Sequence, residues 1–138
     1  MKATRPHLRI LTFVLVALAL GTLSPKTAAA QPAYVGAIVW AQWTPNSWYH
    51  GRVARTCPGG LHVQFDDGDV ACRSFAQIAV DQGARTVHPN ARVLAPWRNG
   101  RFYPGRVVSR FPNGLYQIRF DDGAVGSVAL RSLRTIGH

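Results

Sequence analysis

One stretch of this 138-residue chain occurs twice, and the duplication limits what the chain can fold into. The first copy runs from Trp40 to a Phe-Asp-Asp-Gly motif that ends at Gly68, and the second runs from Leu94 to the same motif at Gly123. Corresponding residues lie 54 positions apart, rising to 55 after a single insertion. A repeat of this length indicates two copies of one small structural unit. We therefore expect the functional residues to be those that both copies carry.

The first thirty residues have the composition of a bacterial-type signal peptide. An apolar run at residues 10–23 follows a basic head, and Ala28–Ala30 offers the small residues that a signal peptidase cleaves after. The run is short for a membrane span, although an uncleaved membrane anchor is the alternative. We expect residues 1–30 to be removed, and the mature chain to begin at Gln31 in a secreted or periplasmic location.

The mature chain is basic. The twelve basic residues that remain are all arginine and face six aspartates, a net charge of +6. Such a chain attracts polyanions such as nucleic acid or cell-envelope polymers. The arginines are scattered, so a solvated surface is the simpler interpretation. The candidates for polyanion contacts are Arg52, Arg55, Arg106, Arg110 and Arg119.

Both copies have the period-two pattern of β-strands. Val39, Ala41 and Trp43 alternate with other residues in the first copy, as their counterparts do in the second. Four strands, a single helical turn and a last short strand are expected in each copy. The first copy places strands at 39–43, 48–53, 61–65 and 70–74 and the turn at 75–78; the second places them at 93–97, 102–107, 116–120 and 125–129, with the turn at 130–133.

Glycine and proline predict where these strands bend. Gly51 and Gly105 stand in the middle of the second strand of each copy, where they suggest a bulge or sharp bend. Pro104 cannot donate to a strand ladder, which predicts an edge or a corner there. Gly68 and Gly123 suit the left-handed position of a tight hairpin. Short, strongly bent strands at this density predict a small closed barrel.

The predicted fold class is therefore all-β, with two tandem barrels of four to five strands. The first barrel is expected at residues 31–80 and the second at 90–138, joined by a short linker at 81–89 that contains Gly and Pro. Two units of about fifty residues are each marginal alone, so we expect them to need further stabilisation.

One source of stabilisation is a disulfide. Cys57 and Cys72 are the only cysteines, both lie in the first copy, and an oxidising compartment would favour their pairing. Whether the two sulfurs meet depends on how tightly the sheet curls. Their counterparts are Phe111 and Ser127, so the bridge would belong to the first copy alone.

The order of motifs resembles the Tudor family of SH3-like barrels, including its agenet-type relatives. The shared pattern is V-x-A-x-W, then Y-x-G-x-V, then a strand ending in F-D-D-G, and it extends from about Val35 to Ile136. The pair of units resembles tandem Tudor proteins that recognise methylated lysine on chromatin. The resemblance implies two SH3-like barrels, each with an aromatic cage for a methylammonium group.

The resemblance also assigns the ligand-binding residues of each cage. They are the Trp that ends the first strand, the Tyr before x-Gly, the Phe of F-D-D-G and the second Asp of that motif. The family's further aromatic residue after the Gly is replaced here by Asp69 and Ala124. The assigned residues are Trp43, Tyr49, Phe65 and Asp67 in the first copy, and Trp97, Tyr103, Phe120 and Asp122 in the second.

These residues predict an exported, non-enzymatic binding module for cationic or methylated Lys and Arg side chains of a protein partner. The alternatives are a polyanion binder, a structural module of the cell envelope, and rings that only fill the core while aspartates shape the turn. No cofactor or metal is expected, because the histidines and cysteines lack ligand spacing. No catalytic residues are expected either, because no nucleophile motif occurs and adjacent aspartates in a turn diverge.

Overall fold

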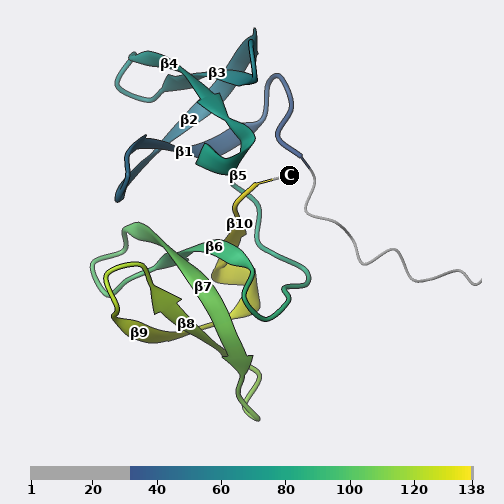
Figure 1. Cartoon of the computed structure of the whole chain (residues 1–138), viewed down its shortest axis with the longest axis vertical. Coiled ribbons are helices and arrows are strands. Elements are labelled where there is room, and N and C mark those ends of the chain that lie inside the picture. Colours follow the sequence, from purple (N-terminus) through teal and green to yellow (C-terminus); the bar gives the residue numbers. More distant parts are fainter. Residues whose placement is uncertain (1–31, 138) are drawn as a thin grey trace, which may run out of the picture.

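The computed structural model describes residues 32–137, so the predicted signal peptide at residues 1–30 lies outside the described residues. Within the described part, no helix is both long enough and apolar enough to cross a membrane. The described chain forms two all-β units, one above the other in Figure 1. The predicted fold class is therefore confirmed.

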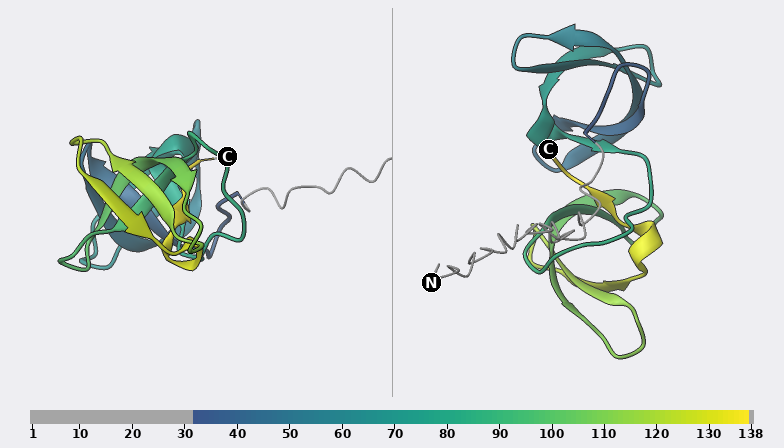
Figure 2. Two further views of the ribbon diagram at one scale, coloured as in Figure 1. Left: turned by 90° about the horizontal axis from the view of Figure 1, so that it is seen from below. Right: turned by 90° about the vertical axis from the view of Figure 1, so that its right-hand side faces the viewer.

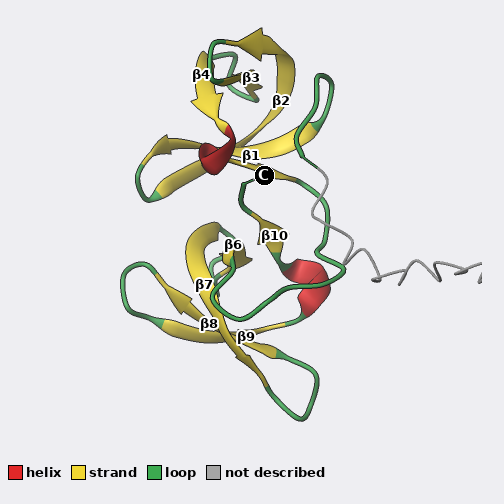
Figure 3. Ribbon diagram, turned by 45° about the vertical axis from the view of Figure 1, so that its right-hand side comes forward, coloured by secondary structure: helices red, strands yellow, loops and turns green. Residues whose placement is uncertain are grey.

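The first unit is a five-stranded antiparallel sheet with the order β4-β3-β2-β1-β5. Its strands alternate between buried and exposed residues, as the sequence pattern predicted. A single 3-10 turn, η1, precedes the last strand (Figure 3). The elements are β1 (Ile38–Thr44), β2 (Ser47–Cys57), β3 (Gly60–Phe65), β4 (Val70–Ser74), η1 (Phe75–Gln77) and β5 (Ile78–Val80).

The second unit repeats this arrangement with the order β10-β6-β7-β8-β9. Its 3-10 turn, η2, stands at the position equivalent to η1, and residues 81–91 connect the two sheets without forming a strand. The elements are β6 (Arg92–Pro96), β7 (Phe102–Arg110), β8 (Tyr116–Phe120), β9 (Val125–Val128), η2 (Leu130–Ser132) and β10 (Arg134–Thr135).

Each sheet curls into a small barrel (Figure 2). The reason is topological: β4 and β5 are opposite edges of the first sheet, yet only the three residues of η1 separate them in the chain. Such a short connection holds the two edges close together. η2 does the same between β9 and β10.

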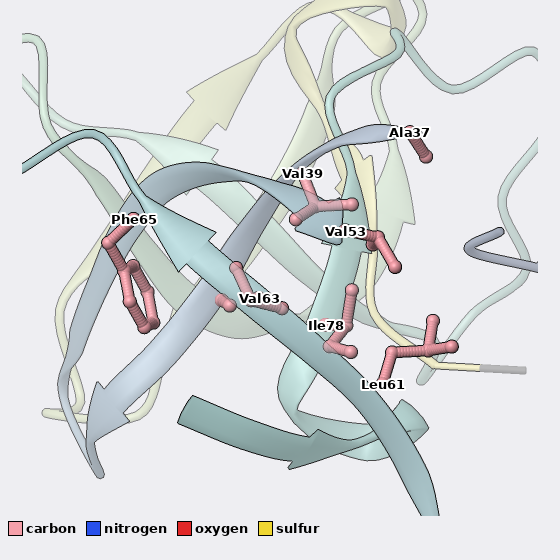
Figure 4. Close-up of a cluster of buried hydrophobic side chains, with 8 residues drawn as sticks. Ala37, Val39, Val53, Leu61, Val63, Phe65 and Ile78 are labelled. Carbon is pink, nitrogen blue, oxygen red and sulfur yellow. The ribbon is translucent and has the colours of Figure 1, made fainter. Parts of the chain in front are cut away.

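A small apolar core fills each barrel. In the first barrel, Val39, Val53 and Val63 are almost fully buried, and Phe65 is 4% exposed at one end of the cluster (Figure 4). The second barrel buries Val93, Val107, Ile118 and Phe120 at the equivalent positions. Burial of this kind contributes about 25 cal/mol per Å² of apolar surface.

The central glycines have a different role from the one predicted. The register shifts fall between Val53 and Arg55 and at the equivalent point of β7, a few residues beyond Gly51 and Gly105. The glycines are instead sites of close approach between strands. A Cβ at Gly51 would lie 2.5 Å from the carbonyl oxygen of Gln64, and the same clash, at 2.6 Å, would arise at Gly105.

Pro104 lies in an interior strand, so the expectation of a sheet edge there is wrong. β7 pairs with β6 on one side and with β8 on the other. The Pro104 carbonyl accepts a hydrogen bond from the amide of Asp121, in the turn just beyond the last β7–β8 pair. The N and C=O of a strand residue face the same neighbour. The Pro104 nitrogen, which has no hydrogen to donate, therefore faces the turn, where the β7–β8 ladder has ended and no backbone hydrogen bond is lost.

The hairpin and disulfide predictions are confirmed. Gly68 and Gly123 have φ values of 97° and 90°, in the left-handed region. Cys57 and Cys72 form a disulfide that joins the end of β2 to β4, with a Cα–Cα distance of 6.2 Å. The bridge crosses the intervening β3, so the curl of the sheet is what brings the two cysteines together.

The two barrels pack through the same outer face of each. Trp40 of β1 is equivalent to Leu94 of β6, and the ring of Trp40 lies 4.9 Å from that of Phe102. Leu94 is completely buried in this contact. After β10, Ile136 forms a β-bridge with Ala79 of β5, so the end of the second barrel joins the first. The cluster comprises Trp48, Ala79, Leu94 and Ile136, with Trp40 and Phe102 packed against it.

Asp81 makes the polar connection between the barrels. Its Oδ1 accepts hydrogen bonds from Arg134 Nε at 2.7 Å and Trp40 Nε1 at 3.0 Å, and its Oδ2 lies 3.2 Å from His50 Nε2. Burial alone would raise the pKa of Asp81. The hydrogen bonds from Arg134, Trp40 and His50 and the charge of Arg134 outweigh burial and lower that pKa.

We predict that replacing both cysteines with serine (Cys57→Ser and Cys72→Ser) lowers the free energy of unfolding by about 2 to 4 kcal/mol, because the bridge closes a loop and restricts the unfolded chain. Urea denaturation measures the change. Reductant should destabilise the natural chain and leave the serine variant unaffected. Equal stability of the two proteins without reductant would contradict the prediction.

We predict that Asp81→Asn destabilises the chain at neutral pH by roughly 1.5 to 3 kcal/mol, the range for hydrogen bonds to a charged group. Folding lowers the pKa of Asp81. The stabilisation that its carboxylate provides is therefore fully present above pH 3.8, the ordinary pKa, and is lost as the pH falls through the lower pKa of the folded state. Unfolding measured from pH 7 to pH 2 should thus show the variant and natural chain converging. Asp69→Asn, at an exposed position, is the control. A pH-independent difference would refute this account.

Candidate functional site

The first barrel has an open depression of about 580 Å³ at one end. Trp43, Tyr49, Phe65 and Asp67, the four residues assigned from the sequence, all line it. They come from the end of β1, the start of β2, the end of β3 and the turn that follows. The remaining lining residues are Trp40, His50, Asp66 and Asp69.

The β1–β2 hairpin positions the two exposed rings of this depression. The register shifts between Gln42 and Thr44, so Trp43 sits in a bulge, a feature that re-aims a side chain. Tyr49 pairs with the buried Ala41 and faces the same side of the sheet. It lies at the open end of the barrel, however, and 54% of it remains exposed.

The second barrel has an equivalent depression of about 370 Å³. Trp97, Tyr103, Phe120 and Asp122, the sequence-assigned residues of this copy, line it together. One further residue comes from the other barrel: Asn46, in the β1–β2 turn. The rest of the lining is Asn99, Pro104, Asp121 and Ala124.

A Trp–Phe ring pair has the same geometry in both depressions. The rings of Trp43 and Phe65 have centroids 5.4 Å apart and an interplanar angle of 87°, and those of Trp97 and Phe120 are 5.2 Å apart at 85°. Edge-to-face contacts of this type are favourable beyond the area they bury. Each Phe is buried in its barrel core, while Trp43 is 45% exposed. The Phe therefore serves both the core and the depression.

The tyrosines of the two sites are held differently. The hydroxyl of Tyr103 accepts a hydrogen bond from Asn99 Nδ2 at 3.0 Å, which fixes the ring against the β6–β7 turn. Pro45 stands at the position equivalent to Asn99 and has no side-chain donor. Tyr49 is accordingly the more freely exposed ring of the two.

The carboxylates give the first site more negative charge. Asp67 and Asp122 each accept a hydrogen bond from a backbone amide two residues on, so both shape their turn and keep an exposed carboxylate. Asp121 forms a two-contact ion pair with Arg92. Asp66 has His50 beside it instead, with Nδ1 and Oδ2 2.8 Å apart.

An arginine of the chain lies over each tryptophan. The guanidinium carbon of Arg73 is 5.6 Å from the Trp43 ring centroid, and that of Arg98 is 5.6 Å from the Trp97 centroid. Neither arginine lines a depression. Each guanidinium therefore covers its indole from outside the site. The indoles already pair with cations at this distance, the geometry of a cation–π contact.

The sequence reasoning missed several residues of these sites. Asn46 was not predicted, because only the packing of the barrels brings it to the second depression. Trp40 of the first depression carried a signal, because the period-two pattern places its large apolar ring on an outer face, where it needs a partner. His50 was not predicted as a site residue, and it contacts both Asp66 and Asp81.

The five arginines considered for polyanion contacts are exposed and lie on both barrels. Arg106 and Arg119 are direct neighbours across β7 and β8, and Arg106 donates a hydrogen bond to the carbonyl of Asn90. Arg52 makes the equivalent contact with the carbonyl of Gly36. Among residues 32–137, no three His, Cys, Asp or Glu side chains converge in a way that could hold a metal ion.

The fold and the two depressions define a tandem pair of small barrels, each with aromatic rings and carboxylates that line one depression. Residues 89–136 match a family model described as the DNA repair protein Crb2 Tudor domain. The Tudor resemblance drawn from the motifs is thus confirmed for the second barrel.

Two further comparisons give similar proteins. The chain is 40% identical over 48 residues to PHD finger protein 20 of Mus musculus; the match covers 35% of this chain and 5% of that protein. Among solved structures, tandem Agenet domain 3-4 of ADCP1 is similar with 16% identity and a TM-score of 0.42, over 76% of this chain and 81% of that one.

Proposed function

We propose that the chain is an exported, non-enzymatic binding module that takes cationic side chains of a protein partner, including methylated lysine and arginine. The observation that carries this proposal is the Trp–Phe pair that both copies hold at 5.4 and 5.2 Å beside exposed aspartates. Core packing alone requires the buried Phe65 but does not account for Trp43, which stays 45% exposed. The match of residues 89–136 to a Tudor domain supports the same function.

The chemistry follows from the groups in the depressions. A methylated ammonium keeps its charge and loses hydrogen-bond donors, so aromatic faces solvate it better than they solvate a small hydrated ion. Each such contact contributes about 0.5 to 2 kcal/mol. Asp67 in the first depression and Asp122 in the second add negative charge at the exposed side. Anionic and neutral side chains would gain none of these interactions.

The first depression should be the stronger cation site. Among the described residues, three aspartates line it, and the other ionisable groups of the lining are His50 and Tyr49. In the second depression, Arg92 neutralises Asp121, which leaves Asp122 as the main negative charge. Tyr49 is also less tethered than Tyr103 and can adjust to a ligand.

We predict that peptides with one trimethyl-lysine bind, and that Trp43→Ala weakens binding at the first site by about 5- to 30-fold, the equivalent of 1 to 2 kcal/mol. Trp97→Ala should act in the same way on the second site. Isothermal titration calorimetry of the natural chain and both variants measures these losses, with unmodified lysine peptides as the reference ligand.

Phe75→Ala is the matched control, because Phe75 is an exposed ring of the first barrel outside both depressions. Binding that survives both tryptophan changes together would refute the proposal.

Titration at two salt concentrations separates the polyanion alternative from peptide binding. Affinity for a nucleic acid that falls steeply with salt, with no peptide binding, would favour the arginine surface instead.

Export is the second part of the proposal. The basic head, the apolar run and Ala28–Ala30 support it, and the Cys57–Cys72 bridge suits an oxidising compartment. We predict that the full chain expressed in a bacterium is recovered outside the cytoplasm with Gln31 as its first residue, as measured by intact mass. Replacing Ala28 and Ala30 with lysine should leave an uncleaved precursor. A mature protein that retains residues 1–30 would contradict this prediction.

A further inference from the structure

We propose that the two depressions act together, and that one extended peptide segment with two cationic side chains occupies both. This inference rests on the proposed function and specifies its ligand. The observation behind it is the β1–β2 hairpin, which lines both sites. Trp43 and Tyr49 stand on its two strands and face the first depression, while Asn46 at its turn lines the second.

The hairpin places the two depressions close together. A chain spans at most about 3.6 Å per residue, so the Cα atoms of Trp43 and Asn46 are at most ~11 Å apart. Figure 1 shows the β1–β2 turn of the first barrel beside the β6–β7 and β8–β9 turns of the second, all on the left of the view. The depressions are therefore neighbours that share one hairpin as a wall.

The joint between the barrels makes this spacing a fixed feature. Leu94 and Ala79 are buried between the barrels, Ile136 bridges to Ala79, and the Arg134–Asp81 ion pair adds a polar contact. A rigid pair of sites selects ligands by the distance between their two anchors. Two barrels joined by a flexible tether would not select ligands by that distance.

The charges around the β1–β2 hairpin indicate how the ligand passes from one depression to the other. Aspartates stand on both sides, at Asp67 and Asp122, whereas the hairpin tip itself carries no charge at Thr44, Pro45 or Asn46. Asn46 is exposed, and within residues 32–137 its side chain makes no hydrogen bond. Its amide has both a donor and an acceptor, the pair of groups that a peptide backbone unit needs.

The spacing of the ligand's two cations follows from this geometry. An extended peptide advances about 3.3 Å per residue, so cations roughly three to six residues apart span about 10 to 20 Å, enough to reach from one depression over the hairpin to the other. Once the first cation is bound, the second binds at the high effective concentration that a short tether provides.

Peptides with two trimethyl-lysines, separated by two to eight residues, test the proposal against peptides with one. We expect the best spacing to bind at least about 10-fold more tightly than the one-cation peptide. Trp43→Ala and Trp97→Ala should each reduce the affinity to the one-cation level. Asn46→Ala should weaken the two-cation peptide by about 3- to 10-fold, because it removes the bridging contact.

Gln64→Ala is the control for Asn46→Ala, since Gln64 is an exposed amide on β3 that lines neither depression. A two-cation peptide that gains no more than the statistical factor of about two at every spacing would overturn this inference. In that case tryptophan-dependent binding of the one-cation peptide would still support the proposed function. Failure of both peptides to bind would refute the two together.

Discussion

The contact between the outer faces of the two barrels is the constraint on which the arrangement of this molecule depends. Each barrel is too small to bury much apolar surface, and each contributes the same face to the joint. Trp40 and Trp48 of the first barrel meet the equivalents Leu94 and Phe102 of the second. The apolar outer face of each copy is thus buried against the same face of the other copy. Duplication of the unit therefore supplies the surface that each barrel needs to pack against.

The joint is connected to the first depression through a short polar chain. Asp81 binds Arg134 of the second barrel and Trp40 of the first, and it also contacts His50, which in turn contacts Asp66. Trp40, His50 and Asp66 line the first depression. Groups that hold the barrels together are therefore also groups that set the charge and shape of that site. The second depression is bordered by the turn that contains Asn46 of the first barrel.

The local structure of this chain was predictable from the sequence, because strand alternation, turn glycines and the repeat depend on residues close together in the chain. The strands were placed within a few residues, and the four residues assigned to each site do line one depression. The bulges at β2 and β7 were placed at the wrong residues, since Gly51 and Gly105 relieve a clash with a neighbouring strand that the sequence does not reveal. Asn46 and Asp81 were missed for a related reason: their roles arise only from the packing of one barrel on the other.

The two copies differ in the residues that surround the Trp–Phe pair, whereas the geometry of the pair itself is the same in both. The first barrel has a disulfide, a freely exposed Tyr49 and three aspartates; the second has a tethered Tyr103 and an aspartate neutralised by Arg92. If the rings served only to fill the barrels, Trp43, which is 45% exposed, would be free to change, because the buried Phe65 already closes the first core. The opposite is observed: the exposed Trp43 has the same geometry toward its Phe as the partly buried Trp97 of the second copy, while the surroundings of the two rings differ. That pattern supports the proposal that both sites bind the same chemical group, with different strengths.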